Sequence, residues 1–354
     1  MLPVVFGIRI LKKKMNKREI LRKTGNTAQL FGVRELQCTS GKAAGLRLLQ
    51  VHNAAGLEFT VIPDKCMDIF DLRFHGVNFA FQTKNGLVGN QWYNPMNTEF
   101  LDYWSAGMLC TCGLENTGPS CTNADGQILP LHGRIGMIPA DNLCVRQFWQ
   151  DDDFRIEIEG QMRECRLEGH NLLLTRKISL SGWSDTIWIE DTIENQGHTA
   201  FNYMLLYHMN FGYPFIDEGT RVHIKSNGSV IGRTLYAQTR TAFCNRIEPV
   251  EDGVEEEVFF HDVLPAADGL SRVHVENHAL GMGAEILYSY ETLPILSQWK
   301  FAAPGEYVLG IEPGNSHIEG RQEGQKNGDL KTIQPDETVH FGLGLRMYTV
   351  KSTV

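Results

Sequence analysis

The chain has 354 residues, a formal charge of -9 at pH 7, 42% apolar residues and 21% charged residues. The acidic balance, without a basic stripe interleaved with aromatics, argues against nucleic-acid binding, because that binding depends on Lys and Arg neutralising phosphates. The composition is that of a globular protein rather than a disordered one, and an all-β domain can exceed about 200 residues.

The amino-terminal region is locally basic, with the sequence KKKMNKREILRK over residues 12–23. The apolar run before it is too short to span a bilayer, and its positive charges follow it, unlike those of a secretory signal. We therefore expect an extension over residues 1–24 that is poorly ordered, with Met1 or Met15 as the true start. A single domain over residues 25–354, a cytoplasmic location and no membrane partner are the corresponding predictions.

The eight cysteines are too few for a disulfide scaffold in a chain of this length. Cys110, Cys112 and Cys121 form the main cluster, but a Cys-x-Cys pair lacks the usual zinc spacing. Buried thiols that pack as small hydrophobic groups are the favoured interpretation, and no metal site is predicted.

Alternation of apolar and polar residues with period two recurs along the chain and predicts β-strands with one buried face. The carboxyl-terminal stretch 338–350 places Val339, Phe341, Leu343, Leu345 and Met347 on one face. Residues 155–165, 171–182 and 186–197 alternate in the same way and predict a meander of neighbouring strands. Further strands are expected within 44–53, 56–65, 67–79, 201–212, 220–230 and 307–313.

This spacing excludes alternating strand and helix units, and helical patterns are scarce. Because twisted open sheets rarely exceed about ten strands, we expect two large packed sheets. The predicted fold is an all-β, large antiparallel β-sandwich with few short helices. The segment from Gln82 to Ala124 is rich in Gly, Asn and aromatics, and we interpret it as a long functional loop region.

Three short motifs place reactive side chains beside Gly or Pro, where a backbone bends at the rim of a sheet: PLHGRIG, LLYHMNFGYP and GIEPGN. They contribute His132 and Arg134, His208 and Asn210, and Glu312. His208 interrupts an apolar run, so on a buried strand it must be hydrogen-bonded or face a cavity. A salt bridge or solvent exposure would explain Glu312 equally well.

Six motifs in order, PDKCMDIFDL, TCGLENTG, PLHGRIG, YHMNFGYP, SQWK and GIEPGN, run from about Gly56 onward. On these motifs the chain resembles the aldose 1-epimerase (galactose mutarotase-like) superfamily, and more closely its bacterial aldose-1-epimerase-like branch of unknown specificity. The resemblance implies the galactose mutarotase-like supersandwich and an isomerase activity on a sugar.

The resemblance also implies roles for individual residues. His208 matches the general acid, Glu312 the general base and His132 a substrate-binding histidine. Arg134, Asn116 and Asn210 lie inside matched motifs and would contact sugar hydroxyls, and Trp299 in SQWK would offer an aromatic face, although a core position explains it as well. An additional substrate-binding Asp of well-studied mutarotases has no counterpart that can be aligned.

Interconversion of sugar anomers suits these residue types. The anomeric hydroxyl loses a proton while the ring oxygen gains one, the ring opens, and reclosure on the other face reverses the two roles. Histidine can exchange a proton near neutrality, and Glu312 is expected to be ionised in the resting protein. No metal, nucleotide or other cofactor is required.

Three alternatives remain at this point. The first is a non-catalytic carbohydrate-binding or sensing protein on the same fold. The second is an isomerase or lyase that acts on an acidic sugar, with Arg134 pairing with a carboxylate or phosphate. A metal-dependent cupin is disfavoured because its His-x-His cluster is absent. The expected partner is a small sugar or sugar acid, a homodimer is left open, and the acidic run VEDGVEEEV at 250–258 is expected to be solvated.

Overall fold

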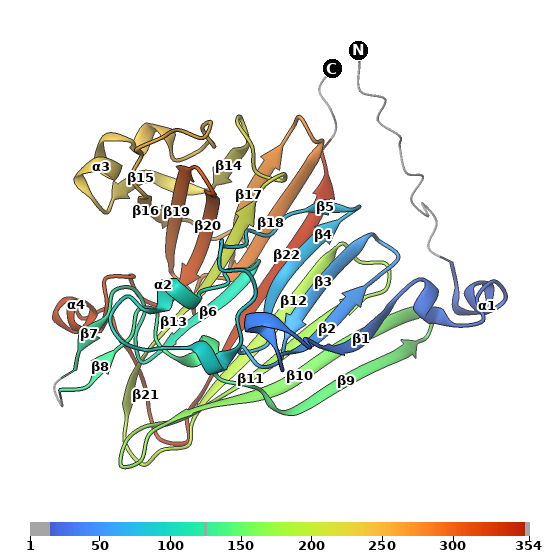
Figure 1. Ribbon diagram of the computed structural model, residues 1–354, viewed down its shortest axis with the longest axis horizontal. Coiled ribbons are helices and arrows are strands. Elements are labelled where there is room, and N and C mark those ends of the chain that lie inside the picture. Colours follow the sequence, from blue (N-terminus) through green and yellow to red (C-terminus); the bar gives the residue numbers. More distant parts are fainter. Residues whose placement is uncertain (1–14, 124–125, 351–354) are drawn as a thin grey trace.

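A computed structural model describes residues 15–123 and 126–350, which form three large sheets and a short hairpin (Figure 1). All ladders between the named strands are antiparallel. The predicted all-β antiparallel sandwich is confirmed. Most of the predicted amino-terminal extension, residues 1–14, lies outside the described residues, whereas Lys17–Leu21 forms the helix α1 and buries Ile20.

The first sheet is built from the amino-terminal strands in chain order: β1 (Gly32–Gln37), β2 (Arg47–His52), β3 (Leu57–Ile62), β4 (Asp68–Phe74) and β5 (Val77–Asn78).

The second sheet has eight strands, in the order β14 (Arg221–Ile224), β17 (Leu270–Asn277), β18 (Met282–Ser289), β22 (Thr338–Thr349), β12 (Thr186–Asn195), β11 (Asn171–Ser181), β10 (Asp153–Cys165) and β9 (Asp141–Gln150). The predicted meander is confirmed, because β10 pairs with β11 and β11 with β12.

The third sheet has the order β15 (Ser226–Gly232), β16 (Glu257–Val263), β19 (Ile295–Ala303), β20 (Glu306–Gly314), β13 (Phe201–Gly212) and β21 (Lys331–Ile333), with β6 (Leu109–Leu114) also paired to β13. A hairpin of β7 (Cys121–Thr122) and β8 (Ile128–Leu129) follows β6. Strand β6 lies inside the segment that was interpreted as a loop region, so that interpretation is corrected there.

Helical elements among the described residues are short. Besides α1 they are α2 (Phe100–Tyr103), α3 (Leu235–Thr239), α4 (Arg321–Asn327) and the single 3-10 turns Thr27–Gln29, Gly41–Ala43, Asn90–Trp92, Ile135–Met137 and Thr241–Phe243. None of the helices in the described ranges has the length and hydrophobicity that crossing a bilayer requires.

The eight-stranded sheet forms one layer, and the other two sheets lie together against it (Figure 1). Arg176 on β11 donates a hydrogen bond to Asp68 on β4, and Asp191 on β12 accepts one from Tyr207 on β13. Leu343, Leu345 and the other inward residues of β22 that alternation predicted are buried, apart from the half-buried Val339. The core therefore lies between the layers. Strand β13 runs through it, and the face of β13 opposite to Tyr207 is available to line a functional site.

Candidate active site

Strands β13 and β20 carry the two predicted reactive side chains and lie next to each other. Their register pairs Met209 with Ile311, which places the preceding residue His208 beside the following residue Glu312. His208 Nε2 lies 3.2 Å from Glu312 Oε1. Both side chains are almost completely buried, with exposed fractions of 6% and 1%. Residues about a hundred positions apart in the sequence thus meet because their strands are hydrogen-bonded neighbours.

The pair lines a pocket of about 190 Å³. Its other polar residues are His132, Arg233 and Glu256. A pocket of about this volume has room for one sugar ring. Most of the remaining lining is apolar.

Aromatic rings form the walls around His208. The ring centroids of Trp104 and Trp299 lie 5.5 and 5.6 Å from that of the imidazole, and 5.9 Å from each other. Trp104 Nε1 donates to Cys110 Sγ, and Trp299 Nε1 donates to Glu256 Oε2 at 3.1 Å. Rings fixed in this way present flat apolar faces of the kind that pack on the C–H groups of a sugar.

His132 reaches the pocket from the loop after β8. Its ring centroid lies 5.6 Å from that of His208, and its Nδ1 accepts a hydrogen bond from the Gly118 N–H. The loop turns sharply at His132 and Gly133, where φ is +60° and +75°. A Cβ at Gly133 would overlap the Gly113 carbonyl oxygen, so glycine is required for the loop to pack on β6.

Burial controls the protonation of the site. Burial, reinforced by Glu256 and opposed by Arg233, raises the pKa of Glu312 to about 8. Burial and the neighbouring His132 hold the pKa of His208 well below its usual value, and burial lowers the pKa of His132 to about 4. Near neutral pH the Glu312–His208 pair therefore holds one proton, on the carboxyl group. The direction of this shift is opposite to the expectation that Glu312 is ionised at rest.

Residues 43–347 match a family model described as a domain of unknown function, DUF4432. The chain belongs to the DUF4432 family. No curated protein sequence matches the chain.

Several solved structures are similar in fold to this DUF4432 chain. A candidate aldose 1-epimerase from Klebsiella pneumoniae has 26% sequence identity and a TM-score of 0.87, over 92% of this chain and 87% of that one. A galactose mutarotase-like protein from Clostridium acetobutylicum has 15% identity and a TM-score of 0.61, over 91% and 100% of the two chains. The galactose 1-epimerase of Lactobacillus acidophilus has 11% identity and a TM-score of 0.60, over 90% and 99%. The galactose mutarotase-like fold predicted from the motifs is confirmed.

Three residues predicted to contact sugar hydroxyls lie outside the pocket lining of the DUF4432 chain. Arg134 forms an ion pair with Glu115. The Asn116 amide donates to the carbonyl oxygens of Pro119 and Pro130, and the fully buried Asn210 amide donates to Gly107 and His208. These side chains hold the loops and strands that carry the site, whereas Trp299 does line the pocket.

The acidic run 250–258 contributes to the site, which its sequence did not indicate. Glu256 lines the pocket, and Glu257 is only 4% exposed and forms ion pairs with Lys300 and Arg240. The expectation of a solvated run is therefore wrong at Glu257, where β16 begins and pairs with β19. Glu256 remains exposed to solvent at the pocket. Arg233 was also missed, since a single Arg after a polar strand carries no distinguishing pattern.

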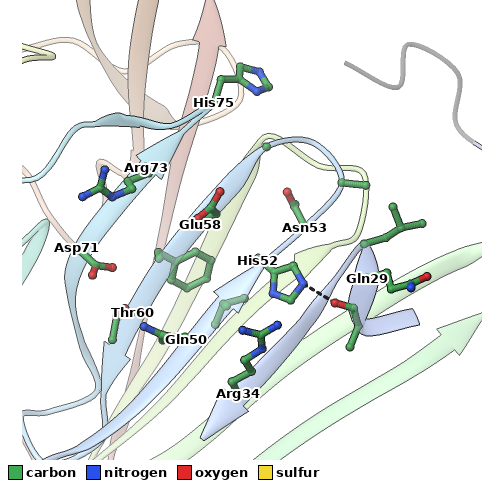
Figure 2. A pocket seen from close by; sticks show the side chains of 16 residues that line it. Gln29, Arg34, Gln50, His52, Asn53, Glu58, Thr60, Asp71, Arg73 and His75 are labelled. Atoms are coloured by element: carbon green, nitrogen blue, oxygen red, sulfur yellow. Dashed lines mark hydrogen bonds between the residues drawn. The ribbon is translucent and has the colours of Figure 1, made fainter. Parts of the chain in front are cut away.

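A larger hollow of about 710 Å³ lies on the face of the amino-terminal sheet (Figure 2). It is lined by polar side chains from β1 to β4, including Arg34, Glu58 and Arg73. His52, drawn at its centre, is bound through Nε2 to the Ala28 carbonyl oxygen at 3.0 Å. This hollow contains no close pair of acid and base, so the smaller pocket around His208 is the candidate active site.

Proposed function

We propose that this DUF4432 chain is an aldose 1-epimerase-like isomerase that interconverts the anomers of a small sugar by acid–base opening and reclosure of the ring. The observation that supports this proposal is the distance of 3.2 Å between His208 Nε2 and Glu312 Oε1 inside a pocket of sugar size. The anomeric hydroxyl and the ring oxygen are bonded to the same carbon, so the acid and the base that serve them must be close neighbours.

The protonation state of the pair suits a reaction that needs one donor and one acceptor. With a single proton on the pair, one group gives a proton to the ring oxygen while the other receives the proton of the anomeric hydroxyl. Rotation about the bond next to the open carbonyl exposes its other face, and reclosure returns both protons. The proton that Glu312 holds at rest can move to the ring oxygen in one direction of the reaction, and the roles of the two groups are reversed on reclosure.

The other residues of the pocket would orient the sugar. The Trp299 ring offers a face for C–H groups, and its indole N–H fixes the Glu256 carboxylate, which can accept from hydroxyls. His132 is kept neutral by burial, and because its Nδ1 accepts from the Gly118 N–H, its Nε2–H can donate to a sugar hydroxyl. Glu256 would then take the role of the additional substrate-binding Asp of well-studied mutarotases, for which this sequence has no counterpart that can be aligned.

A second candidate is an isomerase that acts on a sugar acid. Arg233, rather than Arg134, is the arginine that lines the pocket, and its Nε lies 3.1 Å from Glu319. A guanidinium group at this position can pair with a substrate carboxylate. Sugar acids therefore belong beside neutral aldoses in any test of the substrate.

The deciding experiment is proton NMR exchange spectroscopy. It follows the exchange between the anomeric signals of each sugar in a panel of aldoses and uronic acids. The wild-type chain should accelerate anomer exchange for at least one sugar. The variants His208→Asn and Glu312→Gln should each lose about a hundred- to ten-thousandfold of that acceleration.

A matched control is His317→Gln, which alters a partly exposed histidine paired with Asp329 outside the pocket. This variant should retain full activity. A wild-type chain that binds sugars without accelerating exchange for any of them would instead support the carbohydrate-binding alternative.

A further inference from the structure

A second cluster of buried titratable side chains lies outside the sugar pocket. It consists of Glu115, which follows β6, Glu164 on β10, and His170 in the turn before β11. His170 Nδ1 lies 3.6 Å from Glu115 Oε1, and His170 Nε2 lies 3.9 Å from Glu164 Oε1. One nitrogen or oxygen atom from each of the three residues can be chosen so that all lie within 4.8 Å of one another. The exposed fractions of these side chains are only 8%, 4% and 7%.

Each member of the cluster is held in place by a further partner. Arg134 occupies Glu115 Oε2, and the N–H groups of Leu114 and Glu115 donate to Glu164. The His170 ring packs on Phe201, with centroids 4.8 Å apart. Supporting contacts of this kind orient carboxylate and imidazole ligands in metal sites.

The imidazole itself points to a missing ligand. His170 Nε2 is buried, faces Glu164, and has no hydrogen-bond partner among the described residues. Buried polar groups in proteins are nearly always paired, so an orphaned nitrogen between two carboxylates indicates a group that the polypeptide does not supply.

Charge leads to the same conclusion. Arg134 balances Glu115, but Glu164 has no such cation bonded to its carboxylate among the described residues. A bound proton is one way to neutralise this carboxyl group, and a cation is the other.

We propose that Glu115, Glu164 and His170 form a binding site for one divalent first-row transition-metal ion, of which Zn²⁺ is the representative. Two carboxylates and an imidazole suit Zn²⁺ or Mn²⁺, whereas Ca²⁺ takes six to eight oxygen ligands. The remaining coordination positions would hold water.

The site is structural, and the reaction in the sugar pocket does not pass through it. Glu115 holds Arg134, which belongs to the same loop as His132, and Arg321 donates to the Glu115 carbonyl oxygen. Fixing Glu115 would therefore stabilise the loop that brings His132 to the pocket. This inference is independent of the proposed sugar chemistry.

The test uses the full chain after treatment with a chelator, with Zn²⁺ as the titrant in calorimetry and thermal unfolding. We expect one ion to bind per chain and the melting temperature to rise until the site is saturated, with Mg²⁺ much less effective. Glu164→Gln and His170→Gln should each weaken this binding at least tenfold, whereas His317→Gln, which alters another His–carboxylate pair, should bind as wild type does.

Co²⁺ supplies a readout that does not depend on the stability of variants. Bound to the wild-type chain, it should show visible absorption bands that differ from those of the hydrated ion, and excess Zn²⁺ should abolish them. The absence of stoichiometric Zn²⁺ binding by the wild-type chain would overturn the proposal and leave a proton as the neutralising group. Unchanged Zn²⁺ affinity in His170→Gln would also overturn it.

Discussion

Tyr207 donates a hydrogen bond of 2.8 Å to Asp191, from the face of β13 opposite to the one on which His208 meets the pocket. Asp191 in turn accepts from the fully buried Arg176, which also donates to Asp68 at 2.9 Å. Because side chains alternate along a strand, the strand that carries the proposed acid is anchored from behind by a network of buried charges.

Replacing Arg176 by Met is expected to destabilise the protein by about 3–5 kcal/mol, because Asp68 and Asp191 would remain buried without their cation. Urea unfolding followed by tryptophan fluorescence measures the change. Arg146→Met is the control, since it breaks only the partly exposed pair with Glu157 and should cost less than about 1 kcal/mol. Equal losses in the two variants would show that the buried network does not stabilise the fold.

The activity should depend on pH through the proton shared by Glu312 and His208. The active form carries one proton, so kcat/KM should fall as the pH rises through about 8 and Glu312 ionises. On the acid side it should persist well below pH 6.5, because the imidazole is difficult to protonate. Polarimetry over pH 5 to 10 measures this profile. A rate that increases through pH 8 would show that the ionised pair is the active form.

Trp299→Phe should weaken substrate binding more than it slows the reaction. Phenylalanine keeps an aromatic face but removes the N–H that donates to Glu256, so the carboxylate loses its fixed direction. We expect KM to increase about tenfold with kcat nearly unchanged, as for an interaction made equally in the ground and transition states. Trp188→Phe, on the exposed face of β12, should change neither constant. A selective loss of kcat would instead place Trp299 in the chemical step.

The parts of the fold that the sequence predicts are those with clear alternation. Strands β10, β11 and β12 bury at least every second residue, and β22 does so from Phe341 to Met347, so their faces could be assigned from the residues alone. Strand β6 could not, because all six residues of LCTCGL are buried and no alternation remains. Its flanking aromatics and glycines made the region resemble a loop.

The residues of the candidate site also divide into those that the sequence predicted and those that it could not predict. His132, His208 and Glu312 lie in recognisable motifs, with His132 next to Gly133 and Glu312 next to Pro313, and all three line the pocket. Arg233 and Glu256 reach the same pocket only through the pairing of β15, β16 and β19, which is a long-range property. The motifs alone could not distinguish a side chain that faces the sugar from one such as Arg134, which faces Glu115.

Glu312→Gln should stabilise the protein at alkaline pH while it slows the reaction by about a hundred- to ten-thousandfold. The ordinary pKa of this carboxyl group is 4.5 and burial raises it to about 8, so between these values the folded protein holds a proton that the unfolded chain has lost. Stability must then decrease as the pH rises across this interval, and glutamine removes that dependence. The gain at pH 8 should be on the order of a few kcal/mol and should vanish near pH 4.5.

Urea unfolding of the wild type and the variant at several pH values measures the difference, in which the contributions of other groups cancel. Glu323→Gln, at a partly exposed position on α4, is the control and should show no such trend. A gain that did not depend on pH would mean that glutamine packs better than glutamate, and that the Glu312 carboxyl group is already ionised in the folded protein.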